Sequence, residues 1–192
     1  MGPAPRDRRM YRQLGCAVVS KEAGSVRPRV TFTQFRSPDD PMLLAWLRFR
    51  SLLIASPTGT PSSGASVTVE KRDSGLWRLL ATNNRELGRS FMLYGRFDTA
   101  RAHIAQLQAH PAALAIDHFP GPTNGSRGWA VIADGVPVMT CSRWYGSLST
   151  GAAAAEGALQ AFLHAAMAEA PDQTDASGRL RRGVRERADV GA

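Results

Sequence analysis

The stretch "GWAVIADGVPVMTCSRWYGS", residues 128–147, has the pattern of a β-hairpin, and "LWRLLATNNRELGRSFMLYGR", residues 76–96, repeats that pattern earlier in the chain. Each turn contains residues that tolerate positive φ angles, Asn83-Asn84 in one and Asp134-Gly135 in the other. Equivalent residues are 52 apart before the turn and 51 apart after it, so one residue has been lost in the turn. Self-similarity at such a period predicts a repeated supersecondary unit. The matched pairs are Trp77 and Trp129, Leu79 and Val131, Leu80 and Ile132, Ala81 and Ala133, Tyr94 and Tyr145, Gly95 and Gly146, Phe97 and Leu148, Asp98 and Ser149, and Thr99 and Thr150.

Each hairpin lies between a further predicted strand and a predicted helix. "SVTVEKR" (66–72) precedes the first hairpin and "LAIDHF" (114–119) precedes the second, and both alternate as half-buried strands do. A helix capped by Asp98 follows the first hairpin, and a longer helix capped by Ser149 or Thr150 follows the second. Both units therefore have the order β-β-β-α.

One such unit buries too little surface to be stable alone, so we expect both units to share a core. The sequence predicts an α+β fold in which two tandem β-β-β-α repeats, 66–112 and 113–170, form one antiparallel sheet with both helices on one face. A basic leader, 1–65, precedes this domain, and a polar tail, 171–192, follows it; we expect the leader to be largely disordered and the tail to be disordered.

The leader is rich in Arg, Pro, Gly and Ser, with one β-like run, "RVTFTQF" at 29–35. A short helix is predicted near 41–55, because Asp40 suits an N-cap and Pro41 the first helical position. This helix is either a docking or membrane-surface element or a helix packed on the domain. "SPTGTPSSGAS" (56–66) has the composition of a linker and is the predicted domain boundary.

The formal charge of +8 and pI near 10.7 suggest a nucleic-acid or acidic-membrane partner. However, all 24 basic residues except Lys21 and Lys71 are arginine, a bias typical of a GC-rich bacterial genome. The excess is also uneven, because residues 1–65 carry 10 basic and 4 acidic side chains while residues 66–170 carry 9 and 8. The predicted folded part is therefore nearly neutral.

The tandem pattern resembles the YegP-like family of small bacterial proteins of unknown function. The supporting residues are "WRLLATNNRELGRS" followed by Tyr94 and "WAVIADGVPVMTCS" followed by Tyr145, within a resemblance that covers 66–165. The resemblance implies one sheet of tandem β-β-β-α units, leaves open an exchange of end strands between them, and implies no reaction. The chain departs from the family pattern in its turns, where "NNRE" and "DGVPV" replace Asn-Gly-Glu, and in its helices, where only Gly157-Ala158 approaches the usual Gly-Ile.

The residue types that carry catalysis or bind metal show no recognisable spacing. Cys16 and Cys141 lie far apart, which suggests neither a disulfide nor a cysteine zinc site and makes a reducing cytoplasm the expected compartment. Cys141 aligns with Ser90, so a small buried side chain is expected there rather than a reactive thiol. No cofactor, metal site or catalytic residue is predicted, and the four histidines are expected to be structural: His103, His110, His118 and His164.

If both repeat helices cover one face of the sheet, strand alternation leaves the other face open. The side chains on that face are either Arg89, Phe91, Leu93, Thr140, Ser142 and Trp144, or Ser90, Met92, Tyr94, Cys141, Arg143 and Tyr145. Arginine beside aromatic rings is typical of single-strand nucleic-acid platforms. The alternative is that the 41–55 helix or a second protomer covers this face. The candidate interaction residues are Arg89, Phe91, Arg143 and Trp144.

Together these patterns predict a non-enzymatic interaction or structural module whose partner is an unknown protein or a second copy of the chain. One alternative is a nucleic-acid-binding accessory protein that uses the open sheet face and Arg-rich ends, and another is an enzyme with an unrecognised site. The apolar run at 42–55 is interrupted by Arg48 and Arg50 and is too short to cross a membrane, so no integral membrane segment is expected. A function specific to one copy is expected where the copies differ, as at Arg143 for Met92, Trp144 for Leu93 and Cys141 for Ser90.

Overall fold

The structure is a computed structural model that describes residues 27–35, 37–54 and 75–173. The predicted strand at 66–72, the predicted linker at 56–66 and most of the predicted leader and tail lie outside the described residues.

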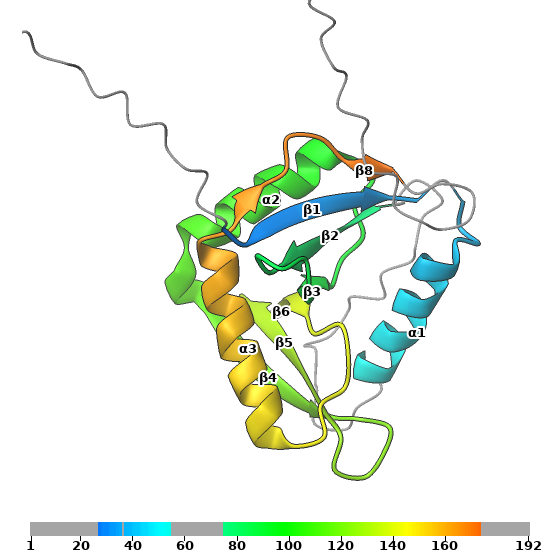
Figure 1. The fold of residues 1–192 in the computed structure, drawn as a ribbon, viewed down its shortest axis with the longest axis vertical. Coiled ribbons are helices and arrows are strands. Elements are labelled where there is room, and N and C mark those ends of the chain that lie inside the picture. The colour runs from blue at the N-terminus through cyan, green and yellow to red at the C-terminus, as the bar shows by residue number, and fades with distance from the viewer. Residues whose placement is uncertain (1–26, 36, 55–74, 174–192) are drawn as a thin grey trace, which may run out of the picture.

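A single mixed sheet runs through the molecule, with helices on both of its faces (Figure 1). In spatial order its strands are β4 (Leu114–Pro120), β5 (Arg127–Ala133), β6 (Val136–Thr140), β3 (Glu86–Ser90), β2 (Gly75–Leu80), β1 (Arg29–Gln34) and β7 (Ala166–Met167); β8 (Asp172–Gln173) also pairs with β1. The α+β class is thus confirmed. The prediction of a purely antiparallel sheet is wrong, because β7 and β8 run parallel to β1.

The strand beside β2 comes from the region predicted to be a leader. β1 pairs antiparallel with β2, with Val30 opposite Leu79 and Phe32 opposite Trp77. Val30 and Phe32 are 3% and 2% exposed, and they belong to the main hydrophobic core. The β-like run predicted at 29–35 is thus a strand, whereas its predicted place in a leader outside the domain is wrong, because β1 supplies core side chains and a full ladder of pairing to β2.

Two helices pack on one side of the sheet, α2 (Phe97–Ala109) and α3 (Leu148–Leu163), and a short 3₁₀ turn, Pro111–Ala113, connects α2 to β4 (Figure 1). Their buried residues, such as Ile104 and Phe162, share one apolar core with Trp77 and Trp129. The Phe162 ring stacks on Trp77 at 5.4 Å between centroids. This core provides most of the buried apolar surface that stabilises the fold.

Both of these helices begin earlier than the sequence indicated. Ser147, not Ser149 or Thr150, caps α3, because its Oγ accepts from the Thr150 N–H at 3.2 Å. Asp98 lies within the first turn of α2 instead of capping it, since Phe97 is already helical and packs on Phe32 at 5.7 Å between ring centroids.

The third helix, α1 (Pro41–Ile54), lies on the opposite side of the sheet (Figure 1). Asp40 Oδ1 accepts from the Met42 N–H at 2.9 Å and so caps the helix. Its apolar side chains form two satellite clusters with the sheet, one around Trp46 with Leu76 and the other around Leu53 with Ala130.

The strand order is symmetric about the central pair β3 and β6. Arg89 pairs with Thr140, the residue 51 positions later that matches it in the hairpin alignment. Both hairpins have a register shift at the matching point, between Leu79 and Leu80 in one and between Val131 and Ile132 in the other. Each hairpin is also tied to the strand segment that carries its tyrosine, by a bridge from Gly75 to Tyr94 and from Arg127 to Tyr145.

Candidate functional site

Two of the four candidate interaction residues lie beneath α1. Phe91 is 5% exposed, and the Arg50 guanidinium lies 4.7 Å from its ring centroid and 5.3 Å from that of Trp46. The Trp144 ring packs against Phe49 of α1 at 4.8 Å between centroids. Of the alternatives left open by the sequence, the structure thus supports α1 as the cover of this part of the sheet.

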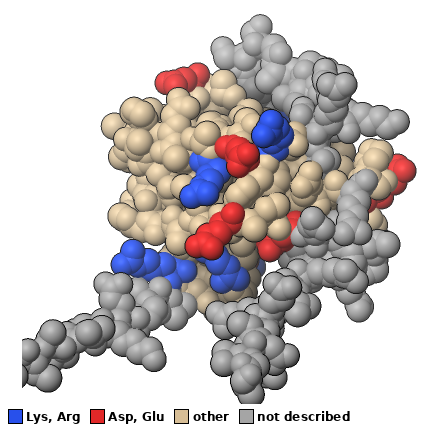
Figure 2. Space-filling model, turned by 90° about the horizontal axis from the view of Figure 1, so that it is seen from above, with Lys and Arg blue, Asp and Glu red and all other residues tan. Residues whose placement is uncertain are grey.

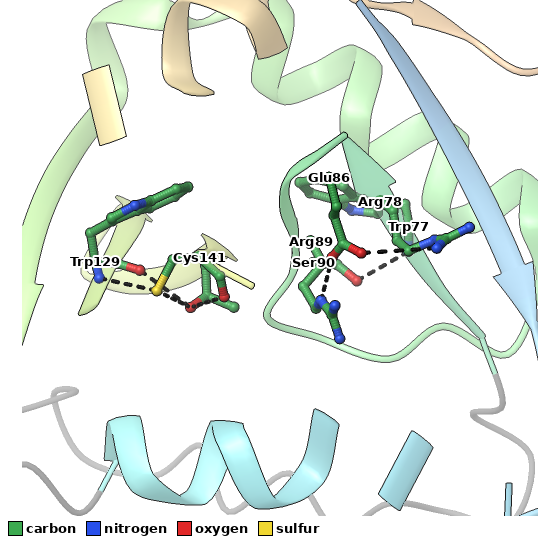
Figure 3. Close-up of polar contacts among 8 residues, drawn as sticks. Trp77, Arg78, Glu86, Arg89, Ser90, Trp129 and Cys141 are labelled. Atoms are coloured by element: carbon green, nitrogen blue, oxygen red, sulfur yellow. Dashed lines mark hydrogen bonds and ion pairs between the residues drawn. The ribbon is translucent and has the colours of Figure 1, made fainter. Parts of the chain in front are cut away.

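The other two candidate residues have different surroundings. Arg89 Nε donates to Glu86 Oε1 at 2.5 Å, and Glu86 Oε2 lies 3.9 Å from Arg78 Nη1 (Figure 3). Burial lowers the pKa of Arg78, whereas the charge of Glu86 acts to raise it. Arg143 is exposed, with its guanidinium 5.2 Å from the Tyr145 ring centroid. The structure does not gather the four residues on one open face, and a role for any of them in an interaction stays a prediction.

Cys141 and Ser90 occupy corresponding positions and make corresponding contacts (Figure 3). The Trp129 N–H donates to Cys141 Sγ at 3.3 Å, and the Trp77 N–H donates to Ser90 Oγ at 3.2 Å. Cys141 is fully buried, and burial raises the pKa of its thiol. A neutral thiol that accepts a backbone hydrogen bond is a structural group rather than a nucleophile.

The predicted first repeat, here called the first unit, contains a buried polar network that begins at Trp77. Trp77 Nε1 donates to the Tyr94 hydroxyl at 3.2 Å, and that hydroxyl lies 2.7 Å from His103 Nδ1. Burial raises the pKa of Tyr94 to about 12 and lowers the pKa of His103. Because the tyrosine oxygen accepts from Trp77, its own proton is available to a neutral His103.

The second unit lacks this network, although it retains the tryptophan and the tyrosine. Ala154 stands at the position that corresponds to His103. Trp129 is 0% exposed, and its Nε1 has no hydrogen-bond partner among the described residues. Nor does any hydrogen bond within residues 27–35, 37–54 and 75–173 engage the Tyr145 hydroxyl. The two units therefore differ in the hydrogen bonds made by their tryptophan and tyrosine side chains.

Each unit has a cavity where the hairpin turn of the other unit meets its helix. The α3 cavity, of about 320 Å³, lies between α3 and the β2–β3 turn. The α2 cavity, of about 290 Å³, lies between α2 and the β5–β6 turn. The correspondence is close, because Ala81 in the α3 cavity matches Ala133 in the α2 cavity, and Gly157-Ala158 matches Gln106-Leu107.

The histidines are dispersed over the fold. His110 Nδ1 lies 2.9 Å from the Gln106 carbonyl oxygen, His118 is half-buried in β4, and His164 is exposed at the end of α3. Within the described ranges, no three or more His, Cys, Asp or Glu residues lie together as metal ligands would. No helix among these residues is both long and apolar enough to cross a membrane.

The two edges of the sheet differ. Strand β1 is flanked by β7 and β8, whereas no described strand lies on the outer side of β4. In β4, Ala115 and Asp117 are exposed and Ile116 is half-buried. Asp117 lies in the middle of β4 and Asp134 in the turn beside Leu114, whereas Arg127 lies opposite Pro120 at the far end, so the part of this edge around 114–118 is acidic.

The structure defines an α+β protein with a mixed sheet between helical layers. It is similar to the solution NMR structure of yegP from E. coli, a protein of unknown function, with 13% identity, a TM-score of 0.41, and coverage of 56% of this chain and 89% of that chain. The YegP-like resemblance predicted from the sequence names the same protein. No family model and no curated protein matches the sequence.

Proposed function

We propose that the protein is a non-enzymatic interaction module, composed of two β-β-β-α copies on one sheet, that binds an extended basic segment of a protein partner along β4. The observation that carries this proposal is the difference between the two sheet edges, since β7 and β8 flank β1 but no described strand flanks β4. An uncovered edge is where an extended peptide adds to a sheet.

The backbone of β4 is oriented for such an addition. Trp129, the partner of His118 in β5, turns its carbonyl toward β6, where it accepts from the Cys141 N–H at 3.0 Å. In a non-hydrogen-bonded antiparallel pair, the backbone N–H and C=O groups of both residues point away from the partner strand. The His118 amide therefore faces outward, away from β5. Asp117 Oδ1 accepts from this amide at 3.0 Å. The next outward-facing amide is that of Ile116, two residues away.

Charge favours a basic partner over a second copy of the chain. A β4–β4 pairing would bring Asp117 and Asp134 of two chains to one edge. Residues 110–120 contain no Lys or Arg that could offset these charges. Like charges at such distances repel, whereas Lys or Arg opposite Asp117 is favourable.

The nucleic-acid alternative is weaker for the folded part. Phe91 and Trp144, the rings expected to stack on bases, are packed against α1 residues. On the face shown in Figure 2, Lys and Arg side chains are interspersed with Asp and Glu rather than gathered in one basic surface. A phosphate backbone is best held by a continuous positive groove.

Two further observations support the remaining parts of the proposal. The matched register shifts, bridges and tryptophan contacts of the two hairpins are those expected of duplicated units. A non-enzymatic role fits the structural use of Cys141 and of the Tyr94–His103 contact within the core.

The test is a chemical-shift titration of the ¹⁵N-labelled full chain with an eight-residue peptide of alternating Lys and Val. We expect saturable shifts at the amides of 114–119 and none with the corresponding Glu-Val peptide. Asp117→Lys should reverse this preference, because Asp117 is exposed and the substitution leaves the core intact. Equal responses to both peptides, or an unchanged preference in Asp117→Lys, would contradict the proposal, as would a dimer in sedimentation that Asp117→Lys dissociates.

A further inference from the structure

The α3 and α2 cavities are of similar size but differ in their lining, because α3 carries small residues where α2 carries larger ones. Ala154 replaces His103, and Gly157 replaces Gln106. In the first unit the His103 imidazole lies 2.7 Å from the Tyr94 hydroxyl, and neither residue lines the α2 cavity. In the second unit Ala154 stands at this position, and it lines the cavity together with Tyr145.

Two polar groups of the second unit make no hydrogen bond within the described residues. The Trp129 N–H is buried without a partner among the described residues, and the Tyr145 hydroxyl has lost the histidine that its counterpart contacts. A buried donor without a partner costs about 1–3 kcal/mol. Of these two residues, Tyr145 lines the α3 cavity.

The charged lining of the cavity is positive. Glu86 is paired with Arg89 and lies near Arg78, so its charge is offset within its own strand pair. Arg85 and Arg143 also line the cavity, and no carboxylate in the described part of the chain pairs with either guanidinium. Guanidinium groups bind carboxylates through two parallel hydrogen bonds.

Arg143 is specific to this unit, because the corresponding residue in the first unit is Met92. The α2 cavity has no arginine in its lining and contains Asp134 instead. The two cavities therefore share their position in the repeat but differ in charge, and only the α3 cavity suits an anion.

From these observations we infer that the α3 cavity binds a small organic acid, with its carboxylate at Arg143 and Arg85 and its apolar part against Tyr145 and the small residues of α3. The volume of about 320 Å³ corresponds to about ten water molecules at about 30 Å³ each. A ligand the size of an aromatic monocarboxylate fits this space. The floor of Ala154 and Ala158 is apolar, so inorganic phosphate would satisfy the arginines and leave the floor unfilled.

The experiment is a chemical-shift titration of the ¹⁵N-labelled full chain with benzoate, neutral benzamide and inorganic phosphate. We expect benzoate to give saturable shifts at the amides of 81–87, 143–145 and 153–158, and to bind at least about tenfold more tightly than benzamide or phosphate. Arg143→Met, which introduces the residue of the first unit, should weaken benzoate binding about tenfold. The matched control is Arg48→Met, because Arg48 is exposed on α1 across the sheet; this variant should leave the affinity unchanged.

A second variant tests the cavity itself. Ala154→His restores the residue of the first unit and should fill the space, so benzoate binding should be lost while the fold is retained in the same spectra. Absence of saturable benzoate shifts at these amides would overturn the inference. So would equal weakening by Arg143→Met and Arg48→Met, or full benzoate affinity in folded Ala154→His, because either result would mean that exposed charge alone attracts the anion.

Discussion

We predict that the Trp77–Tyr94–His103 network stabilises the fold, and the corresponding tyrosine Tyr145 offers a matched control in the same chain. Tyr94→Phe removes one oxygen that accepts from Trp77 Nε1 and contacts His103 Nδ1, and it leaves the buried indole N–H without a partner. A lost hydrogen bond costs about 0.5–1.5 kcal/mol, and an unsatisfied buried donor costs about 1–3 kcal/mol. We therefore expect Tyr94→Phe to lower the free energy of unfolding by about 2 kcal/mol, which corresponds to a fall in Tm of about 4–8 °C for a chain of this size.

Tyr145→Phe is the matched control, because the corresponding hydroxyl makes no hydrogen bond within the described residues. Its cost should stay below about 0.5 kcal/mol. Both variants are compared with the unmodified chain by urea unfolding followed by circular dichroism, with the dependence on urea concentration checked to be equal. Equal destabilisation by the two substitutions would refute the reasoning, since it would show that the cost comes from the ring environment and not from the network.

Three further predictions concern the core. Cys141→Ser should change stability by less than about 1 kcal/mol because Ser90 makes the same contact in the first unit, whereas Cys141→Ala removes the acceptor of the Trp129 N–H and should cost about 1–2 kcal/mol in the same unfolding assay. Gly75→Ala places a Cβ 2.2 Å from the Phe32 ring, so we expect a loss of at least about 2 kcal/mol, and wild-type stability would contradict the close pairing of β1 with β2. Burial lowers the pKa of His103, so the unfolded chain binds more protons near pH 6; stability should be complete above the unfolded pKa of about 6.5 and fall as the pH decreases through the folded pKa, and His103→Gln should flatten this dependence.

The hairpins were predictable because their information is local. Alternation and turn residues place β2 with β3 and β5 with β6. The equivalence of Trp77 with Trp129, and of Tyr94 with Tyr145, follows from their spacing in the sequence alone. The equivalence of Cys141 and Ser90 also came from the alignment, and the structure shows the same backbone contact at both positions.

The outer parts of the sheet were not predictable in the same way. β1 pairs with a strand from which a helix and a linker-like segment separate it, and its short alternating run cannot indicate so distant a partner. β7 and β8 have two residues each, too few to show a period.

The candidate site needed three-dimensional information about neighbours. Arg143 and Trp144 are adjacent in sequence, yet one lines the α3 cavity and the other packs on α1, and the irregular backbone after β6 gives no period from which this could be predicted. The copy-specific positions did indicate Arg143, but Ala154 could be recognised as a lost histidine only once His103 was seen to contact Tyr94.

The contact of β1 with β7 has a consequence for how the protein is made. Arg29 lies opposite Ala166, so the first described strand acquires its outer neighbour only when synthesis has passed almost the whole of the described chain. Until then a nascent or truncated product exposes the backbone of β1, which is open to chaperones, to proteases and to strands of other nascent chains. A chain truncated before residue 166 would lack both β7 and β8, so the outer edge of β1 would be open to pairing with strands of other chains.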